Sequence, residues 1–156
     1  MIVAFVVLPA WTAYANGPHY ALYTNALAAG RAGYYFPHDE FYDDGLREAI
    51  RYVSDTAPKD ALIVNETPGV VRYYLEKYGR TDLQSRVLSD SRFMLTGEEP
   101  AAYVIFQTGR TYFENQEEMK AVRARYRLVH TVSVLGHTAA EVYASNGKVT
   151  AQPAAK

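Results

Sequence analysis

The stretch ALIVNETPGVVRYYLEKYG, residues 61–79, predicts the architecture of this 156-residue chain. ALIVN, at its start, is a short apolar run typical of a strand that is covered on both faces. Pro68 suits the first turn of a helix, and Gly79 suits the position just past a helix end. A strand, a turn and a helix in this order make one βα unit, so the stretch predicts an α/β domain.

Two further helices are predicted on either side of this unit. Upstream, LREAIRYV (residues 46–53) places Leu46, Ile50 and Val53 on one face, as in an amphipathic helix. Downstream, NQEEMKAVRARY begins with Asn115, a favourable N-cap residue. Its acidic residues lie near its start and its basic residues near its end, where each sign interacts favourably with the helix dipole.

The remaining segments predict strands and a hairpin. SRVLSD (85–90) is a candidate second strand, and AAYVIFQ (101–107) repeats the apolar pattern of the first. RLVHTVSVL and TAAEVYAS alternate apolar and polar residues around Gly136-His137, which predicts an antiparallel hairpin with a two-residue turn. This order predicts an α/β layered domain over residues 38–145, with a partly parallel sheet, flanking helices and a C-terminal antiparallel hairpin. Residues 146–156 are expected to form a disordered tail.

The composition limits the class of protein. Hydrophobic residues make up 49% of the chain, which argues against intrinsic disorder, and its length suits one domain. Sixteen basic and seventeen acidic residues give a formal net charge of −1, so nucleic acid is not an expected partner. The absence of cysteine excludes disulfides and thiolate zinc sites.

The first fifteen residues, MIVAFVVLPAWTAYA, carry no charge. They are too few to span a bilayer, which takes roughly 20 apolar residues. Three interpretations remain: a buried strand, the outer end of a transmembrane helix, and a signal peptide with a small-x-small cleavage site at Ala13 to Ala15. No lysine or arginine precedes the apolar run, which counts against the signal peptide.

Most catalytic signatures are missing from the sequence. There is no G-x-G-x-x-G or G-x-x-x-x-G-K-[ST] phosphate-binding motif, no G-x-S-x-G elbow and no H-E-x-x-H metal motif. One remaining candidate is the cluster of His38, Asp39 and Glu40, which could bind a divalent cation or act as acid and base. The alternative is that Asp39 or Asp43 caps the helix that follows.

Two other candidate positions follow the apolar strands. Asn65 and Glu66 lie in a polar loop between a strand and a helix N-terminus, the usual ligand position in open α/β sheets. Arg110 follows the next apolar strand and could present a cation to a phosphate in the same crevice. Ordinary turn chemistry explains Asn65 and Glu66 equally well, and a solvated side chain is the default interpretation of Arg110.

Three stretches carry a resemblance to a known family: PHYALYTNALAAGRAGYYFPHDEFYDDGLREAIRYV (18–53), PGVVRYYLEKYGRTDL (68–83) and YVIFQTGRTYFENQ (103–116). They resemble the C-terminal soluble region of bacterial GT-C type membrane glycosyltransferases. These belong to the dolichyl-phosphate-mannose–protein mannosyltransferase group, similar in architecture to the aminoarabinose transferases that modify lipid A. The resemblance runs from about Ile2 to Ser145 and marks a subfamily tail, not a catalytic signature.

The resemblance implies a domain on the extracytoplasmic face of a membrane. Residues 1–16 would be the end of a truncated transmembrane helix, and residues 17–37 an aromatic connector. The expected partners are the transmembrane portion of the same protein, the bilayer surface and, indirectly, a polyprenyl-phosphate sugar and its acceptor. No catalytic residue, cofactor or metal is expected in this part, because the family's catalytic carboxylates lie near the start of its membrane portion.

Within the connector, Tyr34, Tyr35 and Phe36 could stack on a sugar or lie at the lipid interface, and Arg31 could meet a lipid phosphate. Alternatively, these aromatic residues pack in the domain's own core. Two other functions stay open: a non-catalytic module that binds protein or glycan, and a free-standing α/β enzyme that uses His38, Asp39 and Glu40.

Overall fold

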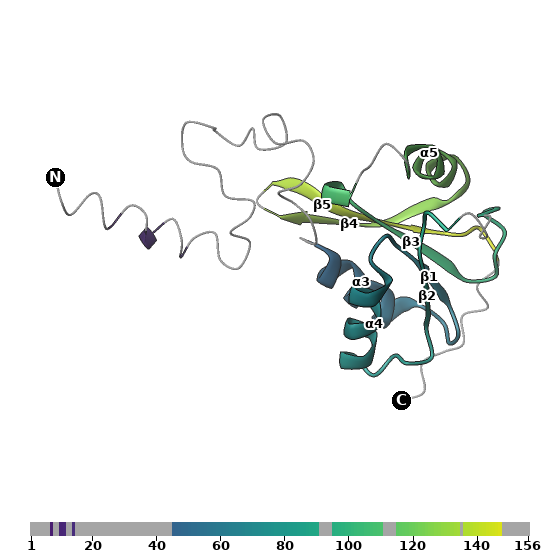
Figure 1. Cartoon of the computed structure of the whole chain (residues 1–156), viewed down its shortest axis with the longest axis horizontal. Helices are drawn as coiled ribbons and strands as arrows, with labels where there is room; N and C mark the ends of the chain where they lie inside the picture. Colours follow the sequence, from purple (N-terminus) through teal and green to yellow (C-terminus); the bar gives the residue numbers. More distant parts are fainter. Residues whose placement is uncertain are drawn as a thin grey trace.

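The computed structural model describes residues 45–90, 95–110, 115–134 and 136–147, together with the isolated positions 7, 10, 11 and 14. Figure 1 shows the folded part as a twisted sheet with helices on both faces. The elements follow one another as a helix, β1, α4, β2, β3, a short 3-10 helix, α5, β4 and β5. This is the predicted order, apart from the added 3-10 turn.

The sheet has five strands in the order β2-β1-β3-β5-β4. β1 pairs in parallel with both β2 and β3, whereas β5 lies antiparallel between β3 and β4. The predicted α/β fold with a partly parallel sheet and an antiparallel hairpin is therefore confirmed. The strands are β1 (Leu62–Val64), β2 (Gln84–Arg86), β3 (Ala102–Gln107), β4 (Arg127–Val134) and β5 (His137–Ala144).

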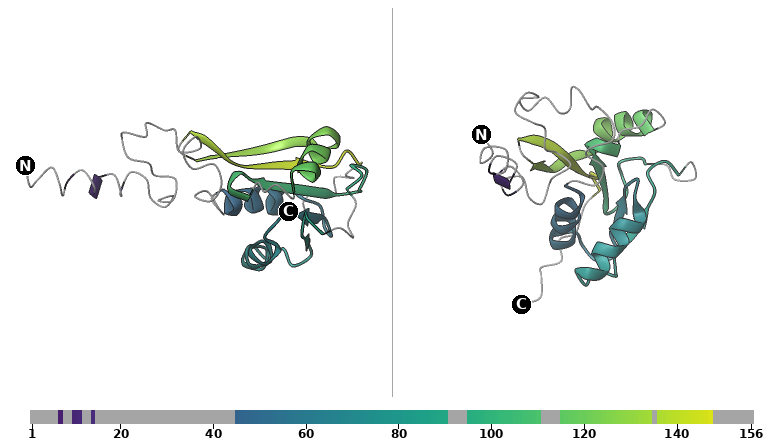
Figure 2. Two further views of the ribbon diagram at one scale, coloured as in Figure 1. Left: turned by 45° about the horizontal axis from the view of Figure 1, so that its top comes forward. Right: turned by 60° about the vertical axis from the view of Figure 1, so that its left-hand side comes forward.

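The helices are α3 (Leu46–Thr56), α4 (Pro68–Lys77) and α5 (Gln116–Arg125), with the 3-10 turn η2 at Thr108–Arg110. α3 and α4 cover one face of the sheet and α5 covers the other (Figure 2). Ile63 and Ile105 pack in the first of the two resulting cores, while Val64 and Phe106 pack in the second. Successive residues of β1 and β3 thus serve opposite faces, which explains why both strands are apolar throughout.

α3 buries Leu46, Ile50 and Val53, the face that the sequence predicts. The helix begins one residue after Gly45, which is its N-cap and has a φ of 78°, in the left-handed region. The prediction that Asp39 or Asp43 caps this helix is therefore wrong: both precede the actual cap and lie outside the described residues. Glycine tolerates the left-handed backbone that this start requires.

α4 has the predicted proline at its start and ends in a Schellman motif. The N–H of Gly79, whose φ is 70°, donates to the carbonyl oxygen of Glu76, and the N–H of Arg80 donates to that of Leu75. The Arg80 side chain then donates to the carbonyl oxygen of Ala57 at 3.0 Å and forms an ion pair with Asp82. The end of α4 is thereby tied to the end of α3.

The hairpin between β4 and β5 is confirmed, but its turn lies one residue earlier than predicted. Val134 pairs with His137, so the two intervening positions are 135 and 136. Gly136 has a φ of 82°, which favours glycine at a tight turn.

Asn146, expected to begin a disordered tail, belongs to the ordered structure. Its backbone N–H donates to the carbonyl oxygen of Gly97 at 3.0 Å, and its side chain donates to that of Arg125 at 2.6 Å. Residues 148–156 of the predicted tail lie outside the described residues.

Glu99 holds the loop before β3 against the end of α5. Its carboxylate accepts hydrogen bonds from the N–H and hydroxyl of Thr96, from the N–H of Gly97 and from the hydroxyl of Tyr126. Burial alone would raise the pKa of Glu99, but these donors stabilise its charged form and bring the pKa below its usual value of 4.5.

We expect this carboxylate to make stability depend on pH. Because the folded-state pKa of Glu99 is lowered, its contribution is present above pH 4.5 and is lost as the pH falls through the folded-state value. Glu99→Gln should lower the free energy of unfolding by about 2 kcal/mol at pH 7, and this deficit should shrink below pH 4.5. Urea denaturation at pH 7 and pH 3.5 measures both values.

Glu98→Gln is the matched control, because Glu98 is exposed. It should change stability by less than about 0.5 kcal/mol at either pH. A Glu99→Gln deficit that stays constant across this pH range would show that the carboxylate charge is not what holds the loop.

Near the N-terminus, residues Val7, Ala10, Trp11 and Tyr14 are helical and exposed. The rings of Trp11 and Tyr14 lie 6.3 Å apart, centroid to centroid. The interpretation of this segment as a buried strand is wrong at these described positions. Among the residues that the structure describes, no helix is both long enough and apolar enough to cross a membrane.

Candidate functional site

The candidate site lies where the chain leaves two neighbouring parallel strands in opposite directions. After β1 the chain continues into α4, which packs Val71 and Leu75 on one face of the sheet. After β3 it continues into α5, which packs Met119 and Val122 on the other face. Such a divergence leaves a crevice outside the carboxyl ends of the strands, where open α/β sheets usually bind ligands. We call this end of the sheet its carboxyl end.

Asn65 spans this crevice and is only 1% exposed. Its side-chain Nδ2 donates to the carbonyl oxygen of Ile105 at 2.9 Å and to Oε1 of Gln107 at 2.8 Å. Its Oδ1 accepts from the N–H and the hydroxyl of Thr67, both at 2.8 Å. Both hydrogens and both lone pairs of the amide are thus used within the chain, so Asn65 fastens β1 to β3 and has no capacity left for a ligand.

Glu66 turns to the other side of the crevice. Its Oε1 accepts from Nδ2 of Asn115 at 2.8 Å, and its Oε2 accepts from the hydroxyl of Ser89 at 3.1 Å. Asn115 also donates to the carbonyl oxygen of Arg110 at 2.9 Å. The carboxylate therefore joins the loops that follow β1, β2 and β3.

Asn115 occupies the predicted N-cap position of α5, but its side chain makes no capping hydrogen bond. The predicted N-cap position is confirmed, but the capping bond for which asparagine is favoured there is not made. Its amide nitrogen, in a residue only 1% exposed, donates to the Glu66 carboxylate from another loop and to the carbonyl oxygen of Arg110, and these two bonds fix the orientation of the side chain. A hydrogen bond to a charged acceptor is stronger than one between neutral groups.

The crevice itself is almost filled. Its cavity has a volume of about 10 Å³, which is room for a single water molecule. Asn65, Glu66 and Arg110, three residues that the sequence singles out, all line this cavity, together with Gln107, Asn115 and Met119. The structure thus brings the three together but leaves no space among them for a sugar or a phosphate.

Sequence reasoning missed Gln107 and Ser89 as members of this network. Gln107 ends the apolar run AYVIFQ, and a polar residue that closes a buried strand is a usable signal, because buried polar groups need a partner. Ser89 carries no comparable signal, since an isolated serine in a loop is commonplace.

The other predicted site residues are outside the described part of the chain. These are the connector residues Arg31, Tyr34, Tyr35 and Phe36 and the cluster His38, Asp39 and Glu40. Their roles stay predictions. Among the side chains that the structure does describe, no group of three or more His, Asp or Glu could hold a metal ion.

The upstream sequence joins the domain at this same carboxyl end. A Cβ atom on Gly45 would lie 2.9 Å from the Cβ of Ala139 and 3.2 Å from Cγ1 of Val132, close to the β4–β5 turn. The end of β3 is fastened there too, since the Thr108 hydroxyl donates to the carbonyl oxygen of Thr138 at 2.6 Å. In Figure 1 the start of α3 and the hairpin turn lie on the same side of the molecule.

Comparisons of this chain with protein-family models, with curated proteins and with solved structures found no match.

Proposed function

We propose that this chain is the extracytoplasmic C-terminal domain of an integral-membrane glycosyltransferase and that its carboxyl end faces the membrane portion of the same protein. The observation that carries the proposal is the place of chain entry. The sequence upstream of Gly45 joins the domain at the end of the sheet that bears Asn65, Glu66 and Arg110. An anchor preceding residue 45 would therefore hold this end nearest the bilayer.

The domain's role in this proposal is structural. The sugar passes from a polyprenyl-phosphate donor to a protein, lipid or glycan acceptor in the membrane portion, and the domain shapes the acceptor side. Two observations favour this role over chemistry at the crevice: the amide of Asn65 is fully used within the chain, and the cavity beside it is water-sized. The hydrogen-bonded loops form a firm surface rather than an open site.

The described positions near the N-terminus support a membrane attachment. Val7, Trp11 and Tyr14 are helical, spaced by four and three residues, and 56%, 66% and 83% exposed. That spacing puts them on one face of a helix, and large exposed apolar faces favour contact with a membrane or a partner. Trp and Tyr are the side chains enriched at membrane interfaces.

A topology experiment on the protein expressed from its native gene tests the location. Alkaline phosphatase and green fluorescent protein are fused in turn after Lys156. We expect an active phosphatase, a non-fluorescent green fluorescent protein fusion and retention in the membrane pellet after alkaline carbonate washing. The opposite reporter pattern, or release by carbonate, would overturn the proposal.

A transfer assay tests the role of the connector. In membranes supplied with a labelled polyprenyl-phosphate sugar, Tyr35→Ala should reduce transfer to the acceptor without changing the domain's melting temperature. Tyr73→Ala is the matched control, because Tyr73 is 59% exposed on α4, and it should leave transfer unchanged. Equal transfer by both variants would show that Tyr35 of the connector does not contribute to the acceptor side.

A further inference from the structure

A second hollow lies at the opposite end of the sheet, where β3 and β4 begin and β5 ends. It has a volume of about 450 Å³, within the usual range of small-molecule sites. Tyr52 and Thr56 of α3, Tyr103 of β3, Arg127 of β4 and Ala144 of β5 line it. We call it the amino-end hollow.

Strand register explains why a hollow forms here. Tyr103 pairs with Ala144, and Ala144 pairs with Arg127, so the three side chains stand in one row on the same face of the sheet. Neighbouring strands are about 4.8 Å apart, which places the two outer residues of the row roughly 10 Å from each other. The alanine methyl group between two large side chains leaves a trough, and the last turn of α3 forms a wall beside it.

The wall is held in position by its own contacts. The Tyr52 ring stacks on His130 at 4.2 Å between centroids, with 7° between the ring planes, and its hydroxyl lies 3.4 Å from the carbonyl oxygen of Val129. The Thr56 hydroxyl donates to the carbonyl oxygen of Tyr52 at 2.8 Å. A fixed aromatic ring loses little conformational entropy when a ligand packs against it.

Two polar groups of the hollow remain available to a ligand. Both line the hollow, and neither the Arg127 guanidinium nor the Tyr103 hydroxyl forms a hydrogen bond or ion pair with another residue that the structure describes. Burial raises the pKa of Tyr103, even though the nearby Arg127 acts to lower it, so the hydroxyl stays protonated at neutral pH. The hollow thus offers a cation and a hydroxyl donor beside the half-buried ring of Tyr52, while the ring of Tyr103 is itself buried in the core.

These groups match one class of ligand. Guanidinium groups pair with carboxylate or phosphate oxygens through charge-assisted hydrogen bonds. Tyrosine presents both an apolar ring face and a hydrogen-bonding hydroxyl, as a sugar ring with its hydroxyl groups requires. We propose that the amino-end hollow binds a glycosyl unit that carries an acidic group, with Arg127 on the carboxylate or phosphate and the Tyr52 ring and the Tyr103 hydroxyl on the sugar.

This inference does not depend on the proposed function, because it concerns the opposite end of the domain from the candidate site. It is tested with the full 156-residue chain, labelled with ¹⁵N and titrated separately with glucose 1-phosphate, glucuronate, glucose and inorganic phosphate. We expect the two acidic sugars to shift the amide signals of Tyr103, Arg127 and Ala144, with glucose and phosphate at least about tenfold weaker.

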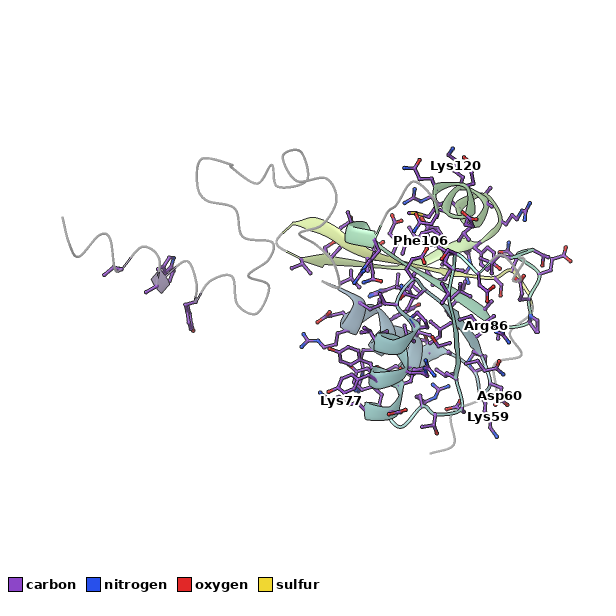
Figure 3. The ribbon with its side chains drawn as sticks, viewed as in Figure 1. Lys59, Asp60, Lys77, Arg86, Phe106 and Lys120 are labelled. Carbon is purple, nitrogen blue, oxygen red and sulfur yellow. The ribbon has the colours of Figure 1, made fainter. Side chains whose placement is uncertain are left out.

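Two variants distinguish recognition of the acidic group from recognition of the sugar. Arg127→Ala should weaken the binding of glucose 1-phosphate at least about tenfold, and Tyr103→Phe should weaken it by a smaller factor while keeping the ring. Arg86→Ala is the control: Arg86, labelled in Figure 3, is exposed in β2 at the other edge of the sheet and should bind as the parent does.

Each alternative outcome overturns the proposal. Equal binding of phosphate and glucose 1-phosphate would mean an anion site without sugar recognition. Equal binding of glucose and glucose 1-phosphate, unaffected by Arg127→Ala, would show that the hollow does not recognise the acidic group. A dissociation constant of about 1 mM would leave the hollow almost saturated at 20 mM ligand. The absence of any signal shift at 20 mM of either acidic sugar would therefore show that the hollow binds neither.

Discussion

Gly45→Ala is expected to lower the free energy of unfolding by about 3 kcal/mol, because two separate penalties meet at this residue. Its φ of 78° costs an L-residue roughly 1–2 kcal/mol. The new Cβ would also lie 2.9 Å from the Cβ of Ala139, so α3 or the β4–β5 hairpin must move. Such overpacking of a core typically costs about 1–3 kcal/mol.

Gly136→Ala is the control that separates these penalties. Gly136 has a closely similar φ of 82°, but no atom beyond its own residue and its two chain neighbours lies within 4 Å of the position of its Cβ. The free energy of unfolding of Gly136→Ala should therefore fall only by the cost of the left-handed backbone, about 1–2 kcal/mol. Urea denaturation of both variants measures the difference. Equal losses would show that the start of α3 does not pack tightly against the hairpin.

Local patterns were sufficient to predict most elements of the fold. The apolar runs that became β1 and β3 are recognisable because both faces of each strand are buried. The start of α4 at Pro68 and its termination before Gly79 follow from backbone chemistry within a few residues. Each of these features depends on neighbours in sequence, so a single sequence reveals it.

The start of α3 and the hydrogen bonds of Asn115 depend instead on distant residues. Gly45 is required at the N-cap partly because Ala139 lies against it, and Asn115 turns to Glu66, 49 residues away. Strand order is non-local in the same sense: β5 inserts between β3 and β4, and this insertion creates the row of Tyr103, Ala144 and Arg127. No spacing along the chain signals that these three residues meet.

The candidate site combines features that the local sequence predicts with features that depend on distant residues. Asn65, Glu66 and Arg110 were predictable, because the residues after parallel strands share one end of a sheet. That the crevice between them is closed was not predictable. It is closed by Gln107 and Asn115, which bond to residues 42 and 49 positions earlier in the chain.

Asn65→Asp is the second large effect that we expect, at about 3 kcal/mol of destabilisation at neutral pH. The change preserves shape and keeps an oxygen that accepts from Thr67. It replaces the donor that serves Ile105 and Gln107 by a second oxygen, which then faces two acceptors in a buried site. The donors of Thr67 at the start of α4 offset part of this cost.

The loss of unfolding free energy caused by Asn65→Asp should become smaller at lower pH. A buried carboxylate beside acceptor oxygens has a raised pKa, so the folded state takes up a proton more readily than the unfolded state. The protonated group donates one hydrogen bond, and the deficit relative to the parent should therefore shrink as the pH falls from 7 to 5. Urea denaturation of parent and variant at both pH values measures this change.

Asn146→Asp provides the comparison for the chemical change alone. Asn146 also donates from its amide, to the carbonyl oxygen of Arg125 at 2.6 Å, but it is exposed, so water replaces the lost donor. Asn146→Asp should lower the free energy of unfolding by less than about 1 kcal/mol, and this change should be independent of pH over this range. If Asn65→Asp behaved like Asn146→Asp, the amide of Asn65 would not be what fastens β1 to β3, and the crevice would be free to open.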